Sequence, residues 1–166
     1  RKVTAGTVNF VLPGRFFFLQ EGDKGLLVES AATDLAVGDR LEVAGFVENT
    51  RGIASLSEAL TRKRGNTPPT PPLAVTAKEL LLPEIADRVE PVVNSDHFGC
   101  LVRIEGLVRQ IERRSGEGLW SLLIESDGEN FRAQLPAPIV TDRPPWLVGS
   151  KLSVCGVCEL EFTPRK

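Results

Sequence analysis

Apolar and polar residues alternate along most of the chain in short runs, and the runs end at Gly, Pro or Asp. Alternation with a period of two is typical of β-strands that bury one face. The runs predict strands at 3–11, 15–21, 25–29, 40–48, more weakly at 53–60, and again at 99–112, 118–125, 129–135 and 150–159. This pattern indicates an all-β fold.

Two strand motifs that contain glycine occur twice. The motif around Gly6 recurs around Gly106, and the motif at 37–47 recurs at 148–158. Such a repeat indicates two copies of one unit, and the unequal spacing predicts an insertion at 136–146 in the second copy. Glycine weakens a strand interior, so glycines at matched positions indicate bulges or sharp bends at barrel corners. The matched glycines are Gly6, Gly45, Gly106 and Gly156.

The repeat and the bent strands predict two tandem OB-fold-like barrels of five strands each, and a β-sandwich is the alternative. We expect the first barrel at 1–64, a proline-rich linker with a short helix at 65–90, and the second barrel at 91–166, with an incomplete fifth strand. Within the linker, Thr76 and Glu79 form a capping-box pattern that predicts the start of the helix, and a second helical turn is expected after it.

The composition limits the chemistry of the chain. Its 166 residues include one His and no Met, and the formal net charge is −2. One His excludes sites that need two or three histidines, and the near-neutral charge argues against strong non-specific binding to DNA or anionic membranes. The sequence contains no phosphate-binding loop, dinucleotide fingerprint, nucleophile elbow or membrane-spanning apolar run. We therefore expect neither catalysis nor a cofactor in this segment.

Three successive phenylalanines lie in the predicted strand 15–21. Because side chains alternate along a strand, Phe17 and Leu19 facing the core would place their neighbours outward. The outward surface could stack a ligand such as nucleic-acid bases, or it could be covered by the other barrel, the linker or a partner. The predicted ligand or interface residues of this strand are Arg15, Phe16, Phe18 and Gln20.

Two further interface candidates lie in the second copy. An alignment of the copies places Trp120 at the position of Phe17, in the core, with a place at the barrel mouth beside a ligand as the alternative. Arg109 and the basic clusters at 62–64 and 113–114 could contact phosphate. Acidic residues are interspersed with them, so solvated turns are the alternative.

The single His and the three cysteines are the weak candidates for a metal site. His97, Cys100, Cys155 and Cys158 could supply four zinc ligands, although residues three apart in a strand, as Cys155 and Cys158 are, face opposite sides. A disulfide from Cys100 to Cys155 or to Cys158 is a second possibility, and buried reduced thiols are the third.

Four motifs follow one another in the first half of the chain: G-x-V at 6–8, F-F-L-Q-E at 17–21, G-L-x-V at 25–28 and V-G-D-x-L-x-V-x-G at 37–45. This order of motifs resembles OB-like modules of secreted nucleases and of the extracytoplasmic sensor regions of bacterial two-component histidine kinases and diguanylate cyclases. The proline-rich link, the Glu-Leu-Leu helix and the strands of the second half are similar to the paired arrangement in the sensor kinases. This resemblance implies a non-catalytic sensor or interaction module, periplasmic or extracellular, in a membrane-bound signal-transduction protein.

The lack of Met and the first residues, Arg-Lys-Val, lead us to expect a segment of a longer protein, in which a kinase or cyclase would lie elsewhere. A small ligand or protein partner is the expected binding partner, and a membrane would be contacted only through flanking segments. A module that binds single-stranded nucleic acid is the first alternative, and a structural docking module of a secreted enzyme is the second.

Overall fold

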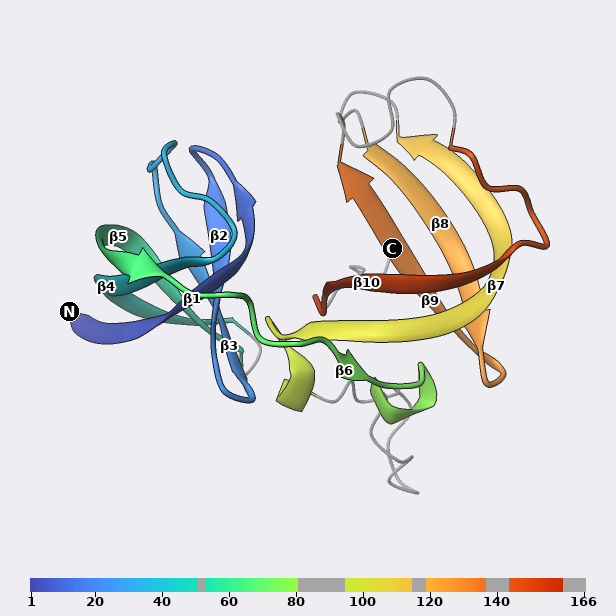
Figure 1. The fold of residues 1–166 in the computed structure, drawn as a ribbon, viewed down its shortest axis with the longest axis horizontal. Helices are drawn as coiled ribbons and strands as arrows, with labels where there is room; N and C mark the ends of the chain where they lie inside the picture. The colour runs from blue at the N-terminus through green and yellow to red at the C-terminus, as the bar shows by residue number, and fades with distance from the viewer. Residues whose placement is uncertain (51–52, 81–94, 115–118, 137–143, 160–166) are drawn as a thin grey trace. The chain divides into compact units, whose positions relative to one another are not determined.

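The computed structural model describes residues 1–50, 53–80, 95–114, 119–136 and 144–159. These residues form β-strands and two short 3₁₀ turns, which confirms the all-β class (Figure 1). The predicted strands are found to within about two residues at each end, except that β5 continues to Asn66. The elements are β1 (Lys2–Leu12), β2 (Phe16–Glu21), β3 (Lys24–Glu29), β4 (Asp39–Thr50), β5 (Ile53–Asn66), β6 (Leu73–Ala74), η1 (Lys78–Leu80), η2 (Ser95–His97), β7 (Leu101–Arg114), β8 (Leu119–Ser126), β9 (Glu129–Pro136) and β10 (Lys151–Val157).

The chain forms two compact units, and neither unit is continuous in sequence. The first, here called the barrel unit, comprises residues 1–73 with the described parts of 93–102 and 156–166. The second, called the sheet unit, comprises the described parts of 74–92 and 103–155. The segment before β7 and the end of β10 therefore belong to the barrel unit, although they lie far from it in sequence.

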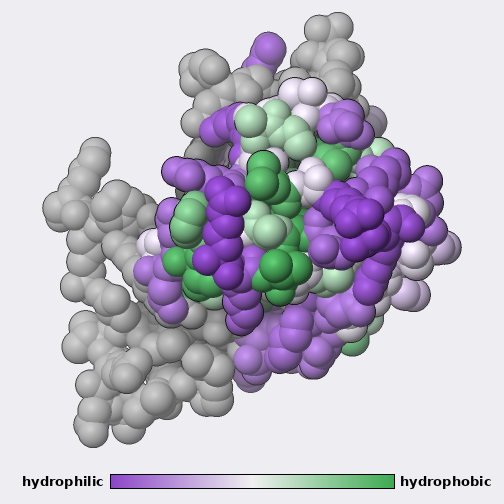
Figure 2. Space-filling model, turned by 90° about the vertical axis from the view of Figure 1, so that its left-hand side faces the viewer, coloured by the Kyte–Doolittle hydropathy of each residue, from purple (hydrophilic) through white to green (hydrophobic). Residues whose placement is uncertain are grey.

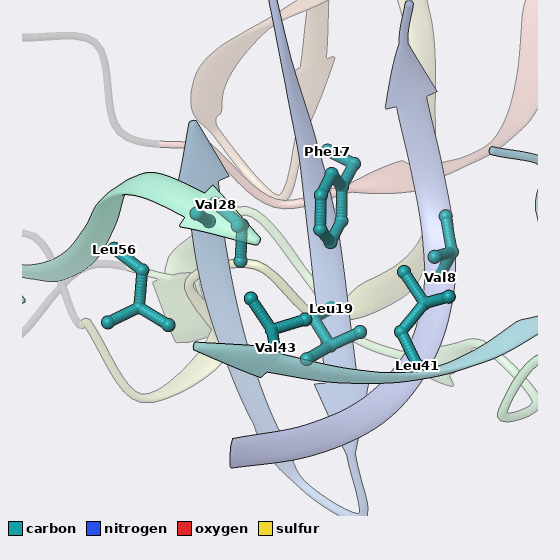
Figure 3. Packing of buried hydrophobic residues seen from close by; sticks show 8 residues of the cluster. Val8, Phe17, Leu19, Val28, Leu41, Val43 and Leu56 are labelled. Carbon is teal, nitrogen blue, oxygen red and sulfur yellow. The ribbon is translucent and has the colours of Figure 1, made fainter. Parts of the chain in front are cut away.

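In the barrel unit, β1, β2, β3, β5 and β4 form a closed barrel in that order, and β4 pairs with β1 to close it. All of the pairings are antiparallel except that of β3 with β5, which is parallel. Figure 3 shows the apolar side chains that converge inside, and Phe17 and Leu19 face inward as predicted. The core residues are Val8, Phe17, Leu19, Val28, Leu41, Val43, Leu56 and Ala59.

Gly45 confirms the expected bulge in its strand. The register of β4 against β5 shifts between Ala44 and Phe46. A Cβ on Gly45 would lie 2.9 Å from the carbonyl oxygen of Ser57 in β5, closer than real Cβ contacts come. Glycine is therefore needed where β4 bends against β5.

The other matched glycines have different surroundings. A Cβ on Gly6 would lie 2.7 Å from the Leu19 side chain, and one on Gly106 would lie 2.5 Å from the carbonyl oxygen of Glu125. These two glycines allow neighbouring strands to approach closely. They are not at the bulges of their strands, because the register of β1 shifts between Val8 and Phe10 and that of β7 shifts between Val108 and Gln110. A Cβ on Gly156 would meet no atom of the described residues within 4 Å.

The sheet unit contains a curled sheet in the order β10-β7-β8-β9, and β6 pairs with β7 off this path (Figure 1). Its core is a cluster of Leu122, Ile124 and Ala133. Half-buried side chains pack against the cluster, and Trp146 of the predicted insertion is one of them. A second closed barrel is not confirmed by the described residues.

The internal repeat is visible in one turn that occurs in both units. Gly38, with φ 94°, donates its N–H to the carbonyl oxygen of Val8 at 2.8 Å. Gly149, with φ 92°, donates to the carbonyl oxygen of Val108 at 2.8 Å. Both glycines have the left-handed backbone that other residues adopt at a cost. The turn leads into β4 in the barrel unit and into β10 in the sheet unit.

The capping box in the predicted linker is confirmed. Glu79 accepts hydrogen bonds from the backbone N–H of Thr76 at 2.6 Å and from its hydroxyl at 3.0 Å, while Thr76 Oγ1 accepts the Glu79 N–H at 3.3 Å. The turn that it opens is the 3₁₀ turn η1. The helical turn predicted beyond it, and most of the insertion at 136–146, lie outside the described residues.

Candidate functional site

The outer face of β2 is covered by other residues of the barrel unit. Phe18 is 2% exposed, and its ring packs edge-on against Phe98 with the centroids 5.7 Å apart. Phe10 and Phe16 complete the cluster, with ring centroids 5.9 to 6.3 Å apart. Four aromatic rings from β1, β2 and the segment before β7 thus form a second apolar cluster outside the barrel.

A buried hydrogen-bond network lies on the same side. Asn9 donates through Nδ2 to Oε1 of Gln20 and to the carbonyl oxygen of Gly99, each at 2.9 Å. Oε1 of Gln20 also accepts the backbone N–H of Leu101 at 3.0 Å. Buried polar groups of this kind specify position because each needs its partner. Asn9 and Gln20 therefore hold residues 98–101 against the barrel.

The four residues predicted on this strand have different environments. Phe18 and Gln20 are buried beneath residues 98–101, so a covering segment within the same unit takes the place of an external ligand there. Phe16 is half-buried against Phe10, and Arg15 is exposed at the start of the strand. Residues 98–101 lie within the predicted second barrel at 91–166, so the cover agrees with one of the alternatives that the sequence left open. The sequence could not show which segment provides it, because Phe98 and Leu101 are distant from β2 in the chain.

Two cysteines meet across a bulge in the barrel unit. Gly99 donates its N–H to the carbonyl oxygen of Cys158 at 2.8 Å, and Cys158 donates to the carbonyl oxygen of Cys100 at 2.9 Å. With Gly99 at φ 73°, this is the hydrogen-bond pattern of a G1 bulge. Burial, with smaller contributions from Cys100 and Glu159, raises the pKa of the Cys158 thiol to about 11. Burial, with Asp23, also raises the pKa of Cys100.

The weak metal candidates do not form a ligand cluster in the part of the chain that the structure describes. Cys155 is exposed and belongs to the sheet unit, whereas Cys158 is buried in the barrel unit. All three cysteines are free thiols. His97 accepts the N–H of Cys100 through its backbone carbonyl at 3.0 Å, and the Cys100 thiol donates to the carbonyl oxygen of Asp23 at 3.3 Å.

Several basic residues that could contact phosphate are engaged in ion pairs. The Nζ of Lys63 lies 2.6 Å from a carboxylate oxygen of Asp39, and Nη2 of Arg109 lies 2.6 Å from that of Glu125. Partly neutralised side chains attract phosphate less than free ones do. The ion pairs of the basic candidates are Lys63–Asp39, Arg64–Glu42 and Arg109–Glu125.

The strand register corrects the alignment used for Trp120. Phe17 lies opposite Val11 in the barrel unit, and Leu122 lies opposite Ile111 in the sheet unit. Leu122, two residues after Trp120, therefore occupies the position of Phe17. Trp120 is half-buried near the end of the hairpin, with the guanidinium carbon of Arg113, its cross-strand partner, 5.9 Å from its ring centroid.

An exposed apolar surface crosses the outer side of β1, β4 and β5. Val3 pairs with Ala44, and Ala44 pairs with Leu60, so the three side chains share one face. Val3 and Leu60 are each 62% exposed, and Phe46 is 44% exposed beneath the guanidinium of Arg1. Figure 2 shows apolar residues gathered on the exposed face of this unit and bordered by hydrophilic ones. We call Val3, Ala44, Phe46 and Leu60 the outer apolar row.

Sequence reasoning missed the outer apolar row. The signal in the sequence was the apolar character of Phe46 and Leu60. In strands that bury one face, residues on the outer face are expected to be polar. A bulge at Gly45 changes the alternation there, so the direction in which Phe46 points could not be read from the strand period alone.

The sheet unit has a pocket of about 380 Å³ on the side of β6 and η1. Its charged lining combines Arg103 with three carboxylates, so it has no single sign of charge to select a ligand. The lining residues are Ala74, Val75, Thr76, Glu79, Arg103, Glu105, Ser126 and Asp127.

Comparison with protein-family models, with curated proteins and with solved structures finds no match to this chain. Among the described residues there is no helix with the length and apolar character required to cross a bilayer.

Proposed function

We propose that the chain is a non-catalytic sensor or interaction module of a bacterial signal-transduction protein, with the outer apolar row as its docking surface for a protein partner. The observation that carries the proposal is the exposure of Val3, Phe46 and Leu60 together on one face of a closed barrel. A barrel whose core is already filled does not need these side chains for folding. Clustered apolar groups on such a surface commonly mark protein–protein contacts.

The topology supports an OB-fold-like interpretation of the first barrel. The strand order β1-β2-β3-β5-β4 describes a five-stranded Greek-key barrel. The glycine turn that is common to both units supports the sheet unit as a less complete relative of the same fold. The resemblance of the sequence motifs supports placement in the extracytoplasmic region of a sensor histidine kinase or a diguanylate cyclase.

The proposed mechanism is a shift between arrangements of the two units. Within the described residues the chain passes between the units at 73–74, 102–103 and 155–156, and partner binding at the barrel unit would act on the sheet unit through these connections. Such a signal requires that the partner bind one arrangement more tightly than another.

Single-stranded nucleic acid is a less supported partner. The β2 surface that would stack bases carries Phe18, which is covered by Phe98. The basic side chains Lys63, Arg64 and Arg109 are paired with carboxylates. Fluorescence anisotropy with a labelled oligothymidylate at low salt tests this alternative. Micromolar binding that weakens steeply with salt would replace the proposed function with nucleic-acid binding.

A chimaeric receptor tests the docking surface directly. Residues 1–166 replace the extracytoplasmic region of a transmembrane histidine kinase, and phosphorylation of its response regulator is measured. We expect the double variant Phe46→Ser/Leu60→Ser to change this phosphorylation. The matched control is Val37→Ser/Leu73→Ser, because both of these residues are 53% exposed in the same unit but lie outside the row. Equal phosphorylation with the two double variants would contradict the proposal.

A further inference from the structure

The pocket of the sheet unit has walls that hydrogen bonds hold in place. The N–H of Val75, directly after β6, donates to the carbonyl oxygen of Arg103 in β7 at 3.0 Å. The capping box of Thr76 and Glu79 then fixes η1. The volume of about 380 Å³ lies within the usual range of small-ligand pockets, roughly 300–1,000 Å³. All of its lining residues belong to the sheet unit, so the pocket is complete within one unit.

The alternation of β7 brings two opposite charges into this pocket. Ile104 is 5% exposed on the core side of the strand, whereas its neighbours Arg103 and Glu105 are exposed on the other face. Residues two apart on one face of a strand are separated by about 6.7 Å along it. A cationic and an anionic side chain thus line the pocket at a spacing that the strand sets.

These charges are not neutralised by other described residues. The ion pairs and side-chain hydrogen bonds of the described residues do not include Arg103 or Glu105, nor Asp127 in the turn between β8 and β9. The third carboxylate of the lining, that of Glu79, is engaged in the capping box. The pocket therefore offers one cationic group and two anionic groups to a ligand.

Ser126 adds a buried polar group to the lining. The residue is 8% exposed, and no described residue forms a hydrogen bond with its hydroxyl. A serine hydroxyl both donates and accepts, so it suits a ligand that carries a donor group and an acceptor group together. Ala74 and Val75 provide the apolar part of the lining, and Val75 is 9% exposed.

We propose that this pocket binds an α-amino acid with a short apolar side chain. Arg103 holds the α-carboxylate, because a guanidinium donates two parallel hydrogen bonds to a pair of oxygens. Glu105 and Asp127 accept hydrogen bonds from the α-ammonium group, and the apolar side chain of the ligand lies against Val75. The inference goes beyond the proposed function, because the outer apolar row belongs to the other unit.

The mixed charges favour a zwitterion over a ligand of one sign. A simple anion at Arg103 is repelled by Glu105, and a simple cation at Glu105 is repelled by Arg103. In an α-amino acid both charged groups are attached to one carbon, so they are separated by less than the two side chains are. The remaining distance leaves room for a charge-assisted hydrogen bond of about 2.7–2.9 Å at each end.

Isothermal titration of the whole chain with L-valine tests the proposal. Two compounds with the same branched side chain are the controls: isovalerate lacks the ammonium group, and isobutylamine lacks the carboxylate. We expect L-valine to bind at least about tenfold more tightly than either, because each control loses one charged contact. Equal affinity for L-valine and one of the controls, or no binding of L-valine at millimolar concentrations, would overturn the proposal.

Arg103→Gln and Glu105→Gln assign the two ends of the ligand. We expect Arg103→Gln to lose the preference for L-valine over isobutylamine, and Glu105→Gln to weaken the preference over isovalerate. Each preference is a ratio measured on one variant, so a change in overall stability does not imitate its loss. Lys151→Gln removes an exposed cation of β10 outside the lining and should bind as the wild type does. A preference over isobutylamine that persists in Arg103→Gln contradicts the proposal.

Discussion

Gly25 of β3 and Gly99 of the segment before β7 lie backbone against backbone. A Cβ on Gly25 would lie 2.2 Å from the carbonyl carbon of Gly99 and 2.3 Å from the carbonyl oxygen of Phe98. Because both colliding atoms belong to the backbone, no rotation of a side chain could relieve the contact. This pair of glycines lets residues 98–101 lie on the barrel closely enough for Phe98 to reach Phe18.

Gly25→Ala is expected to destabilise the barrel unit by about 1–3 kcal/mol, the usual cost of overpacking a tight contact. The measurement is urea unfolding followed by circular dichroism, with hydrogen exchange of β2 and β3 to locate the effect. Gly156→Ala is the matched control, because its Cβ would meet none of the atoms in the described part of the chain within 4 Å. Equal unfolding midpoints for the two variants would show that the contact yields at little cost.

Gln20→Leu is expected to lower the free energy of unfolding by about 1–3 kcal/mol. The substitution removes the acceptor for Asn9 Nδ2 and for the N–H of Leu101, and a buried donor without a partner is costly. The exposed Gln134, changed to Ala, is the control. Faster exchange of the Leu101 amide in Gln20→Leu would locate the loss in this network, whereas unchanged exchange would argue that the network does not hold the segment.

Asp39 is expected to make the barrel unit sensitive to acid. The hydrogen bond from Lys63 holds the pKa of Asp39 below its usual range, with a further contribution from the N–H of Ala36, against the opposing effect of burial. A carboxyl whose pKa is lowered on folding stabilises the protein above its unfolded pKa of about 3.9. That stabilisation is lost as the pH falls through the folded pKa.

The variant Asp39→Asn should therefore cost about 1 kcal/mol at pH 7, because Lys63 is half exposed and solvent weakens the ion pair. This cost should shrink as the pH falls below about 4. Urea midpoints measured from pH 7 to pH 2 check the expectation against Asp34→Asn, a change at an exposed carboxylate. A difference between wild type and Asp39→Asn that stays constant with pH would contradict it.

Cys155 is expected to react with iodoacetamide before the other two thiols. Cys155 is exposed, whereas burial raises the pKa of Cys158 to about 11 and also raises that of Cys100, so little thiolate forms at either buried site near pH 8. Peptide mass spectrometry should find a single adduct in the native chain and three in urea. First modification at Cys100 or Cys158 would contradict the burial of these thiols.

Much of the barrel unit could be predicted from local sequence. The alternation in 15–21 correctly predicted that Phe17 and Leu19 face inward, and the glycine in 40–48 correctly predicted a bulge at Gly45. Both features depend on residues within one strand, so period and backbone freedom suffice. The alignment that matched Trp120 with Phe17 was wrong by two residues, since Leu122 occupies that position. The sequence of the two copies could not reveal the register of β8 against β7.

The candidate surfaces could be predicted only in part. Phe18 and Gln20 were correctly placed on the outer face of β2, yet their cover comes from residues 98–101. This cover depends on contacts between segments that are far apart in the chain.

By itself, the sequence determined the strands, the repeat, the glycine turns and the capping box of Thr76, because each follows from hydrogen bonding and side-chain alternation over a few residues. Only the tertiary structure decided that five strands close around Val8 and Leu41, that Gly25 and Gly99 touch, and that the described strands leave β9 and β10 unjoined. Closure depends on pairing between distant strands, and its free energy comes from burial that no local pattern encodes.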